Sequence, residues 1–262
     1  MIRDLLFRIA KAVLSERAQA NLRAWQRRHR LQWPRHGSVE FGMLRRTTPI
    51  SRVFGYDRGM PIDRYYIESF LARHRLDIRG RVLEIGDPYY TKKFGGDRVT
   101  ASDALHYVPG SPDATIIADL TCADAIPSNT FDCIILTQTL QMIFDFRAAM
   151  RHINRILKPG GVLLMTSGNI SRIARREGTD PWGEYWHFTS QSLRRIFIDF
   201  FPEGNTTITV YGNVFSAAAF LYGLAAEELR RDELDKSDPD FEVLNAVRAV
   251  KPGSVKELCE RN

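Results

Sequence analysis

The sequence is poor in cysteine and has no long apolar run and no low-complexity segment. Its three cysteines in 262 residues, Cys122, Cys133 and Cys259, lack metal-ligand spacing and, being odd in number, cannot all pair within the chain. No stretch approaches the roughly 20 apolar residues that a membrane-spanning helix requires. Reduced cysteines fit a cytoplasmic location best.

Acidic residues are scarce at the N-terminus. Residues 1–36 contain nine Lys or Arg side chains but only Asp4 and Glu16, which gives this segment a net charge of +7. The rest of the chain carries 28 basic and 29 acidic side chains, a net charge of −1. Because the body has no excess of positive charge, the sequence disfavours a nucleic-acid-binding body.

A secretory signal is also missing, since charged residues interrupt the apolar stretch at the start of the chain. The apolar residues there recur at helical spacing: Ile2, Leu5, Leu6, Ile9, Ala12 and Val13. This pattern predicts a basic amphipathic helical extension over residues 1–36. Such a helix docks on its own domain, or it contacts an anionic membrane surface or a protein partner.

After residue 60, short apolar runs bounded by turn residues alternate with helical patterns. Strands are predicted at 81–85, 98–102, 114–118, 131–136, 162–166, 206–211 and 242–250. Helices are predicted at 62–76, 145–157, 190–201 and 214–230, with a turn at 158–161 and a loop at 231–240. The alternation predicts an α/β fold: a doubly wound, Rossmann-like, mostly parallel seven-stranded sheet with helices on both faces.

Three motifs in this order carry a family resemblance: Arg81-Val82-Leu83-Glu84-Ile85-Gly86-Asp87, Phe131-Asp132-Cys133-Ile134-Ile135-Leu136, and Ile156-Leu157-Lys158-Pro159-Gly160-Gly161-Val162. Together they resemble the class I S-adenosyl-L-methionine (SAM)-dependent methyltransferases, most of all small-molecule enzymes of the methyltransferase type 11 kind. Some of these accompany glycosyltransferases in polysaccharide or glycoside pathways. The resemblance implies four parts: the extension (1–36), a lid or linker (37–79), the methyltransferase domain (80–252) and a tail (253–262).

The cofactor of such a fold lies outside the carboxyl ends of the strands. Glu84 and Gly86 end the first predicted strand, where glycine lets the backbone approach a ligand. Asp103 follows the second, 19 residues after Glu84, close to the usual spacing of an acid that binds both ribose hydroxyls.

The resemblance places further cofactor-binding residues after the next two strands. It implies that Asp119 and Leu120 lie near the adenine, and that Thr137 and Gln138 lie beneath the methionine end of SAM. No metal is expected.

The glycine loop departs from the family pattern. Where class I enzymes usually have Glu/Asp-x-Gly-x-Gly-x-Gly, this chain follows Gly86 with Asp87-Pro88-Tyr89-Tyr90. SAM has no pyrophosphate, so the loop need not cradle one, and a dinucleotide-dependent dehydrogenase is disfavoured.

In related enzymes the segment after the fifth strand builds the acceptor pocket. Trp182, Tyr185 and Trp186 offer broad faces for a sugar or an aromatic ring. His187 is the predicted base for a hydroxyl proton, with Glu184 as the alternative.

The segment before the first strand often covers the cofactor in this class. Here Tyr65 or Tyr66 is expected to cover the ligand, and Arg64 or Arg58 is the expected cation for the SAM carboxylate or an anionic acceptor.

The function predicted from the sequence is SAM-dependent O-methylation of a small hydroxyl-bearing acceptor, a sugar or a glycoside. One alternative is a degenerate methyltransferase fold that serves as a non-catalytic interaction module. The other is an RNA methyltransferase that uses residues 1–36 as a basic arm.

Overall fold

The computed structural model describes residues 14–31, 34, 36–174 and 183–253, and the chain divides into two units, 1–47 and 48–262. In the first unit, helix α2 (Glu16–Arg28) begins after Ser15, whose hydroxyl accepts a hydrogen bond from the Ala18 amide. An acidic first turn and a basic last turn match the helix dipole. The predicted apolar stripe over residues 2–13 lies outside the described residues.

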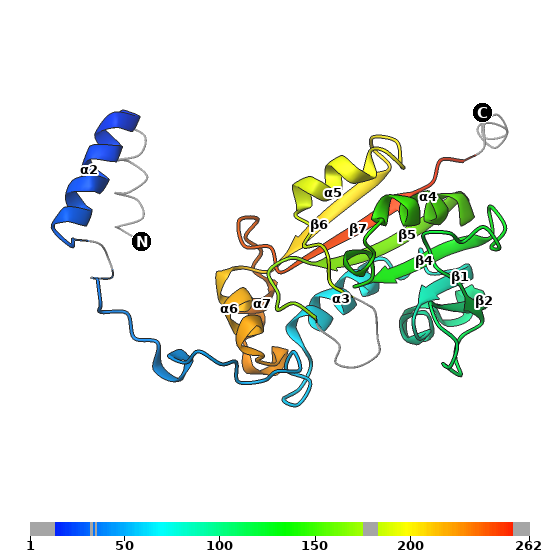
Figure 1. The fold of residues 1–262 in the computed structure, drawn as a ribbon, viewed down its shortest axis with the longest axis horizontal. Helices are drawn as coiled ribbons and strands as arrows, with labels where there is room; N and C mark the ends of the chain where they lie inside the picture. The colour runs from blue at the N-terminus through cyan, green and yellow to red at the C-terminus, as the bar shows by residue number, and fades with distance from the viewer. Residues whose placement is uncertain (1–13, 32–33, 35, 175–182, 254–262) are drawn as a thin grey trace. The chain divides into compact units, whose positions relative to one another are not determined.

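The second unit is built on a seven-stranded sheet with the strand order β3-β2-β1-β4-β5-β7-β6 (Figure 1). The strands are β1 (Gly80–Ile85), β2 (Val99–His106), β3 (Ile116–Ile117), β4 (Phe131–Thr137), β5 (Leu157–Gly168), β6 (Thr206–Tyr211) and β7 (Leu244–Val250). Strand β7 runs antiparallel to both of its neighbours, β5 and β6, and the other strand pairs are parallel. The predicted doubly wound, mostly parallel sheet is therefore confirmed, and its order reverses between β1 and β4.

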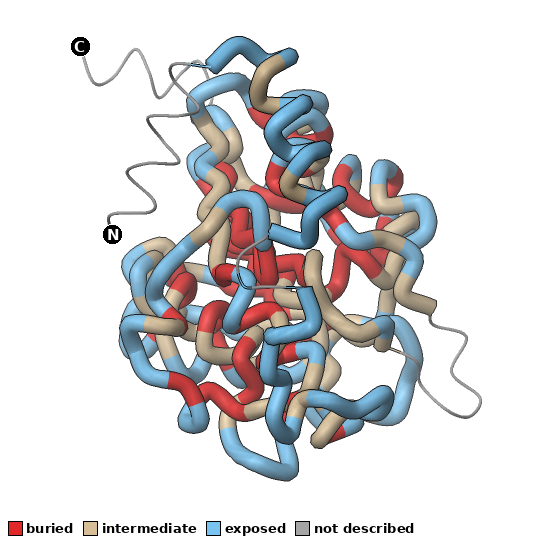
Figure 2. The backbone as a smooth tube through the Cα atoms, turned by 90° about the vertical axis from the view of Figure 1, so that its left-hand side faces the viewer, coloured by how far each residue is buried: buried red, intermediate tan, exposed pale blue. Residues whose placement is uncertain are grey.

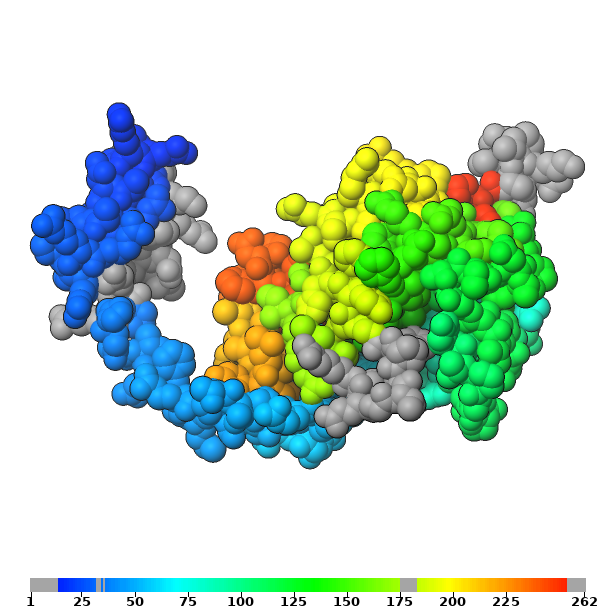
Figure 3. Space-filling model, in the orientation of Figure 1, coloured from blue at the N-terminus to red at the C-terminus, as the bar shows by residue number. Residues whose placement is uncertain are grey.

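Helices cover both faces of the sheet. On one face, α4 (Phe146–Ile156) and α5 (Ser190–Phe197) lie side by side (Figures 1 and 3) and pack with the strands into one apolar cluster. On the other face, α3 (Ile62–Arg73), α6 (Val214–Tyr222) and α7 (Arg231–Asp235) form a second cluster. The buried positions concentrate between these layers (Figure 2).

Two predicted boundaries in the sheet were wrong. Strand β2 continues four residues past the predicted end at 102, because Leu105 and His106 pair with β3. The predicted turn at 158–161 lies within β5, as a bulge where the register against β4 shifts.

Two helical boundaries were also wrong. The helix predicted at 214–230 stops at Tyr222, because Gly223 adopts a φ of +73° that ends it, and a Cβ there would collide with Ser51. The loop predicted at 231–240 contains α7, whose first turn is acidic.

The connection from β1 to β2 is short. After the turn at 86–90, a π-helical turn (Thr91–Gly95) and a 3-10 turn (Gly96–Arg98) lead into β2. A doubly wound fold usually places a longer crossover helix there.

Ile153 lies at the centre of the α4 cluster and is fully buried. We expect Ile153→Ala to lower the free energy of unfolding by about 2–5 kcal/mol, because it leaves a cavity in a packed core. Ile198→Ala is the matched control; Ile198 is 49% exposed, and a surface change costs about 0.5 kcal/mol or less. Urea denaturation of both variants measures the free energy of unfolding. An equal decrease in the two variants would contradict the packing described.

Candidate functional site

A cleft of about 1790 Å³ opens at the carboxyl ends of β1, β4 and β5, where the strand order reverses. Ligands bind at this position in open α/β sheets. A typical pocket for one small molecule is about 300–1,000 Å³, so the cleft has room for two. Nine of the sequence-predicted residues line it: Arg64, Glu84, Gly86, Asp119, Leu120, Thr137, Gln138, Glu184 and Tyr185.

Glu84 holds the turn that follows β1. Its carboxylate is 2% exposed and accepts hydrogen bonds from the Tyr90 amide (3.0 Å), the Thr91 amide (2.8 Å) and the Thr91 hydroxyl (2.8 Å). Burial raises the pKa of Glu84, and these three bonds oppose that shift. Glu84 is therefore a positioning residue whose oxygens are committed to the loop.

Gly86 presents the backbone to the cleft. Its φ is +89°, a region that disfavours side chains, and a Cβ built there would meet nothing within 4 Å. Open space beside a glycine backbone is what a ligand needs for close approach.

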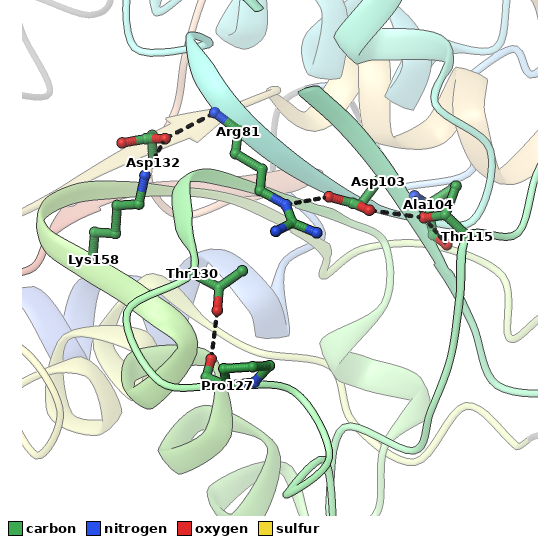
Figure 4. Close-up of polar contacts among 8 residues, drawn as sticks. All are labelled: Arg81, Asp103, Ala104, Thr115, Pro127, Thr130, Asp132 and Lys158. Carbon is green, nitrogen blue, oxygen red and sulfur yellow. Dashed lines mark hydrogen bonds and ion pairs between the residues drawn. The ribbon is translucent and has the colours of Figure 1, made fainter. Parts of the chain in front are cut away.

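Asp103 does not line the cleft. It lies within β2, three residues before the strand ends, because β2 is longer than predicted. Its carboxylate pairs with the Arg81 guanidinium at 2.7 Å and accepts from the Thr115 hydroxyl at 3.1 Å (Figure 4). This position does not fit the predicted role of ribose acid.

Asp119 and Leu120 follow β3 as predicted. One oxygen of Asp119 accepts from the amide and the hydroxyl of Thr121, each at 2.8 Å, which fixes the turn. Leu120 is 4% exposed and adds an apolar wall beside that carboxylate.

Gln138 joins the ends of two strands. It follows β4 with a φ of +49°, a strained conformation for a residue other than glycine. Its Oε1 accepts from the Gly168 amide at 2.9 Å and from the Gln141 carboxamide at 2.5 Å. Its Nε2 lies 3.5 Å from an oxygen of Asp63 on α3.

Asp63 was not among the predicted site residues, although it stands in the segment predicted to cover the cofactor. The side chain is half-buried in the first turn of α3 and lines the cleft. Burial raises the pKa of Asp63, against the opposing influence of Arg64 and its backbone amide. A carboxylate with a raised pKa is a stronger proton acceptor than an ordinary aspartate.

Arg64 supplies positive charge to the cleft. Its guanidinium donates to the phenol oxygens of Tyr56 (2.8 Å) and Tyr90 (2.6 Å). Burial raises the pKa of Tyr90, which keeps that phenol neutral. Both hydrogen-bond partners are phenols and not carboxylates, which leaves the charge of Arg64 for a ligand carboxylate.

The predicted aromatic residues of the acceptor segment differ in placement. Tyr185 is 48% exposed, lines the cleft and packs edge-on against Phe144 at 5.4 Å. Trp186 donates to the backbone oxygen of Ile143 at 3.1 Å and packs with the α4 cluster, so it clamps the segment to the body. Trp182 lies outside the described residues.

His187 is not among the residues that line the cleft. Its Nδ1 lies 2.5 Å from the backbone oxygen of Asn169, and its Nε2 lies 3.6 Å from a carboxylate oxygen of Glu184. Glu184, the predicted alternative, does line the cleft and accepts from the Ala174 amide at 2.5 Å.

Tyr65 also points away from the cleft, since its hydroxyl donates to Asp235 of α7 at 2.6 Å. Within the described part of the chain, no cluster of three or more His, Cys, Asp or Glu side chains is placed to hold a metal ion. No helix there has the length and apolar character needed to cross a membrane.

The fold and the cleft define a class I methyltransferase. Residues 56–203 match the family described as "Methyltransferase domain", and the chain belongs to that family. Its cofactor is SAM. A comparison with curated proteins returned no significant match.

Similar solved structures share the fold at low identity. They include the cyclase SpnF (18% identity, 75% of this chain and 84% of that chain, TM-score 0.48). A SAM-dependent methyltransferase from Archaeoglobus fulgidus has 12% identity over 71% and 94% of the two chains, with a TM-score of 0.46. The N-methyltransferase NodS from Bradyrhizobium japonicum has 16% identity over 73% and 97%, with a TM-score of 0.43. These similarities carry no argument about the acceptor.

The residues present fit SAM. Gly86 has open space beside its backbone, and Arg64, Asp119 and Leu120 line the same cleft. A bound SAM would find there a cation for its carboxylate and a polar and an apolar contact for its adenine. Two features do not fit the family pattern: the loop after Gly86 lacks the usual second and third glycines, and the carboxylate of Asp103 pairs with Arg81.

The raised pKa of Asp63 predicts a stability effect. Since folding raises this pKa above the ordinary value of 3.8, the ionised carboxylate destabilises the folded state as the pH rises above that value. Asp63→Asn should therefore raise the melting temperature, by an amount that grows as the pH rises above 3.8 and levels off once the carboxyl of the folded wild type is ionised. Scanning calorimetry of both proteins measures this. The exposed Asp240→Asn variant serves as the control, and a gain that is equal at all pH values would refute the assignment.

Proposed function

We propose that this protein transfers the methyl group of SAM to a hydroxyl of a small acceptor, a sugar or a glycoside. The observation that carries the proposal is the half-buried Asp63 carboxylate, which lines the same cleft as the Gly86 turn and contacts Gln138. When bound, SAM supplies an electrophilic methyl group. A neutral hydroxyl is a poor nucleophile, so a nearby base is useful for this acceptor.

In this proposal, the cofactor side of the cleft is formed by Gly86, Asp119, Leu120, Thr137 and Gln138, with Glu84 holding the turn. Arg64 binds the methionine carboxylate, as a guanidinium suits a planar anion. Thr137 and Gln138 lie at the end of β4, next to the end of β5.

The acceptor side is formed by Asp63, Tyr185 and Phe144. Tyr185 and Phe144 are both exposed and offer aromatic faces that suit the apolar face of a sugar ring. The backbone oxygen of Gln141 accepts from the amides of Tyr185 (2.9 Å) and Trp186, which holds this segment against the Gln138 network. We assign the role of base to Asp63, because it borders the cleft whereas His187 is held by Asn169 and Glu184.

A non-catalytic interaction module is the second candidate. Two observations favour it: Asp103 is withdrawn from the cleft, and the connection after Gly86 lacks a full helix. The two candidates differ in cofactor binding, which the first experiment below decides.

The cofactor is tested by calorimetric titration of SAM into the wild type and Gly86→Ala. We expect micromolar binding by the wild type and a loss of about tenfold or more in the variant, since a Cβ would enter the ligand's space. Gly204→Ala is a matched control: its φ is also +89° with nothing within 4 Å of a Cβ, but it does not line the cleft. No binding by a folded wild type would favour the interaction module.

The acceptor and the base are tested together. Formation of S-adenosyl-L-homocysteine is measured with a panel of hydroxyl-bearing glycosides and a matched panel of amines, and we expect turnover with the hydroxyl compounds. With the best acceptor, Asp63→Asn should lower kcat by about 10²–10⁴-fold, the usual contribution of a general base, while the SAM affinity stays within about threefold. His187→Gln should lower kcat by less than about tenfold.

The reverse pattern, with His187→Gln the more damaging change, would transfer the role of base to His187. Turnover restricted to amines would remove the hydroxyl acceptor from the proposal.

A further inference from the structure

Strand β2 ends at a histidine, His106, three residues beyond Asp103, which was predicted to be the ribose acid. Ile85 pairs with Leu105, and the Gly86 amide donates to the Leu105 backbone oxygen at 3.0 Å. His106 is therefore the β2 residue level with the Gly86 turn, and it lines the cleft. Asp103, three residues earlier, is turned to Arg81 and Thr115 (Figure 4).

His106 has an unused hydrogen-bonding atom. Its Nε2 is buried and has no hydrogen-bond partner among the described residues. Of the buried side-chain atoms in this state, it is the one whose residue borders the cleft. Buried polar atoms without a hydrogen-bond partner are rare in native proteins. A ligand that hydrogen-bonds to His106 Nε2 would supply the missing partner.

Asp87 lies beside this nitrogen. One of its oxygens is 3.8 Å from His106 Nε2, too far for a hydrogen bond, and its side chain is 71% exposed. Asp87 directly follows Gly86 and also lines the cleft. The pair thus offers an imidazole nitrogen and a carboxylate at the turn where a ligand approaches the backbone.

A ribose diol matches this pair. Each hydroxyl donates one hydrogen bond and accepts others, a carboxylate accepts, and an imidazole nitrogen donates or accepts according to its tautomer. We propose that His106 and Asp87 bind the ribose hydroxyls of the cofactor, in place of an acid at the position predicted for Asp103. The inference rests on the proposed function, since it concerns the same cofactor.

The test is calorimetric titration of the full-length protein with S-adenosyl-L-homocysteine and with its analogue in which both ribose hydroxyls are replaced by hydrogen. The wild type should bind the natural nucleoside about 10–100-fold more tightly than the analogue, as expected for two hydrogen bonds. His106→Ala and Asp87→Asn should each weaken binding of the natural nucleoside by about tenfold and leave binding of the analogue nearly unchanged.

Asp103→Asn is the matched control and should change neither affinity by more than about twofold, because that carboxylate faces Arg81. Circular dichroism checks that each variant is folded. If His106→Ala is unstable, the test rests on Asp87→Asn, because the Asp87 side chain is exposed. This inference would be overturned if Asp103→Asn alone no longer bound S-adenosyl-L-homocysteine more tightly than the analogue, while Asp87→Asn kept the wild-type affinities. The proposed function would then remain intact. A folded wild type that bound neither SAM nor S-adenosyl-L-homocysteine would overturn both.

Discussion

The carboxamide of Gln138 is the contact on which the geometry of the cleft depends. A single side chain in a strained conformation joins the end of β4 to the end of β5, through Gly168, and to Gln141 of the following turn. Gln141 in turn accepts from Ser167 through its side chain and holds the 185–186 backbone through its main-chain oxygen. The strain at Gln138 is therefore offset by a buried network that positions the cofactor side and the acceptor side together.

The other anchor is the buried Glu84. A carboxylate in the core is costly unless it is hydrogen-bonded, and here all of its bonds come from the loop that follows β1. This arrangement explains how the chain retains a defined turn after Gly86 although the usual second and third glycines are absent and the next helical segment is a single π turn. Local backbone amides, tied to one side chain, replace the longer helix as the support of the loop.

Charge distribution in the cleft separates two tasks. Arg64 donates hydrogen bonds to two phenols, whereas burial raises the pKa of Asp63, its neighbour in sequence. Both come from the first turn of α3, which the Gln138 contact connects to the sheet. In our proposal, one helix end thus contributes both the cation for the methionine carboxylate and the base for the acceptor.

The sequence by itself determined the sheet. Apolar runs bounded by turn residues predicted all seven strands, because a strand buried on both faces has few polar residues and short, sharp ends. It also placed Glu84, Gly86, Asp119 and Gln138 at the strand ends, since position relative to a strand is a local property. Tertiary structure decided the rest. Pairing with β3 lengthened β2, and the carboxylate of Asp103 pairs with Arg81 of β1. Contacts with residues 18 or more positions away hold Trp186 and His187 out of the cleft. The burial of Asp63 likewise arises from contacts between α3 and distant strands, which no local pattern of residues encodes.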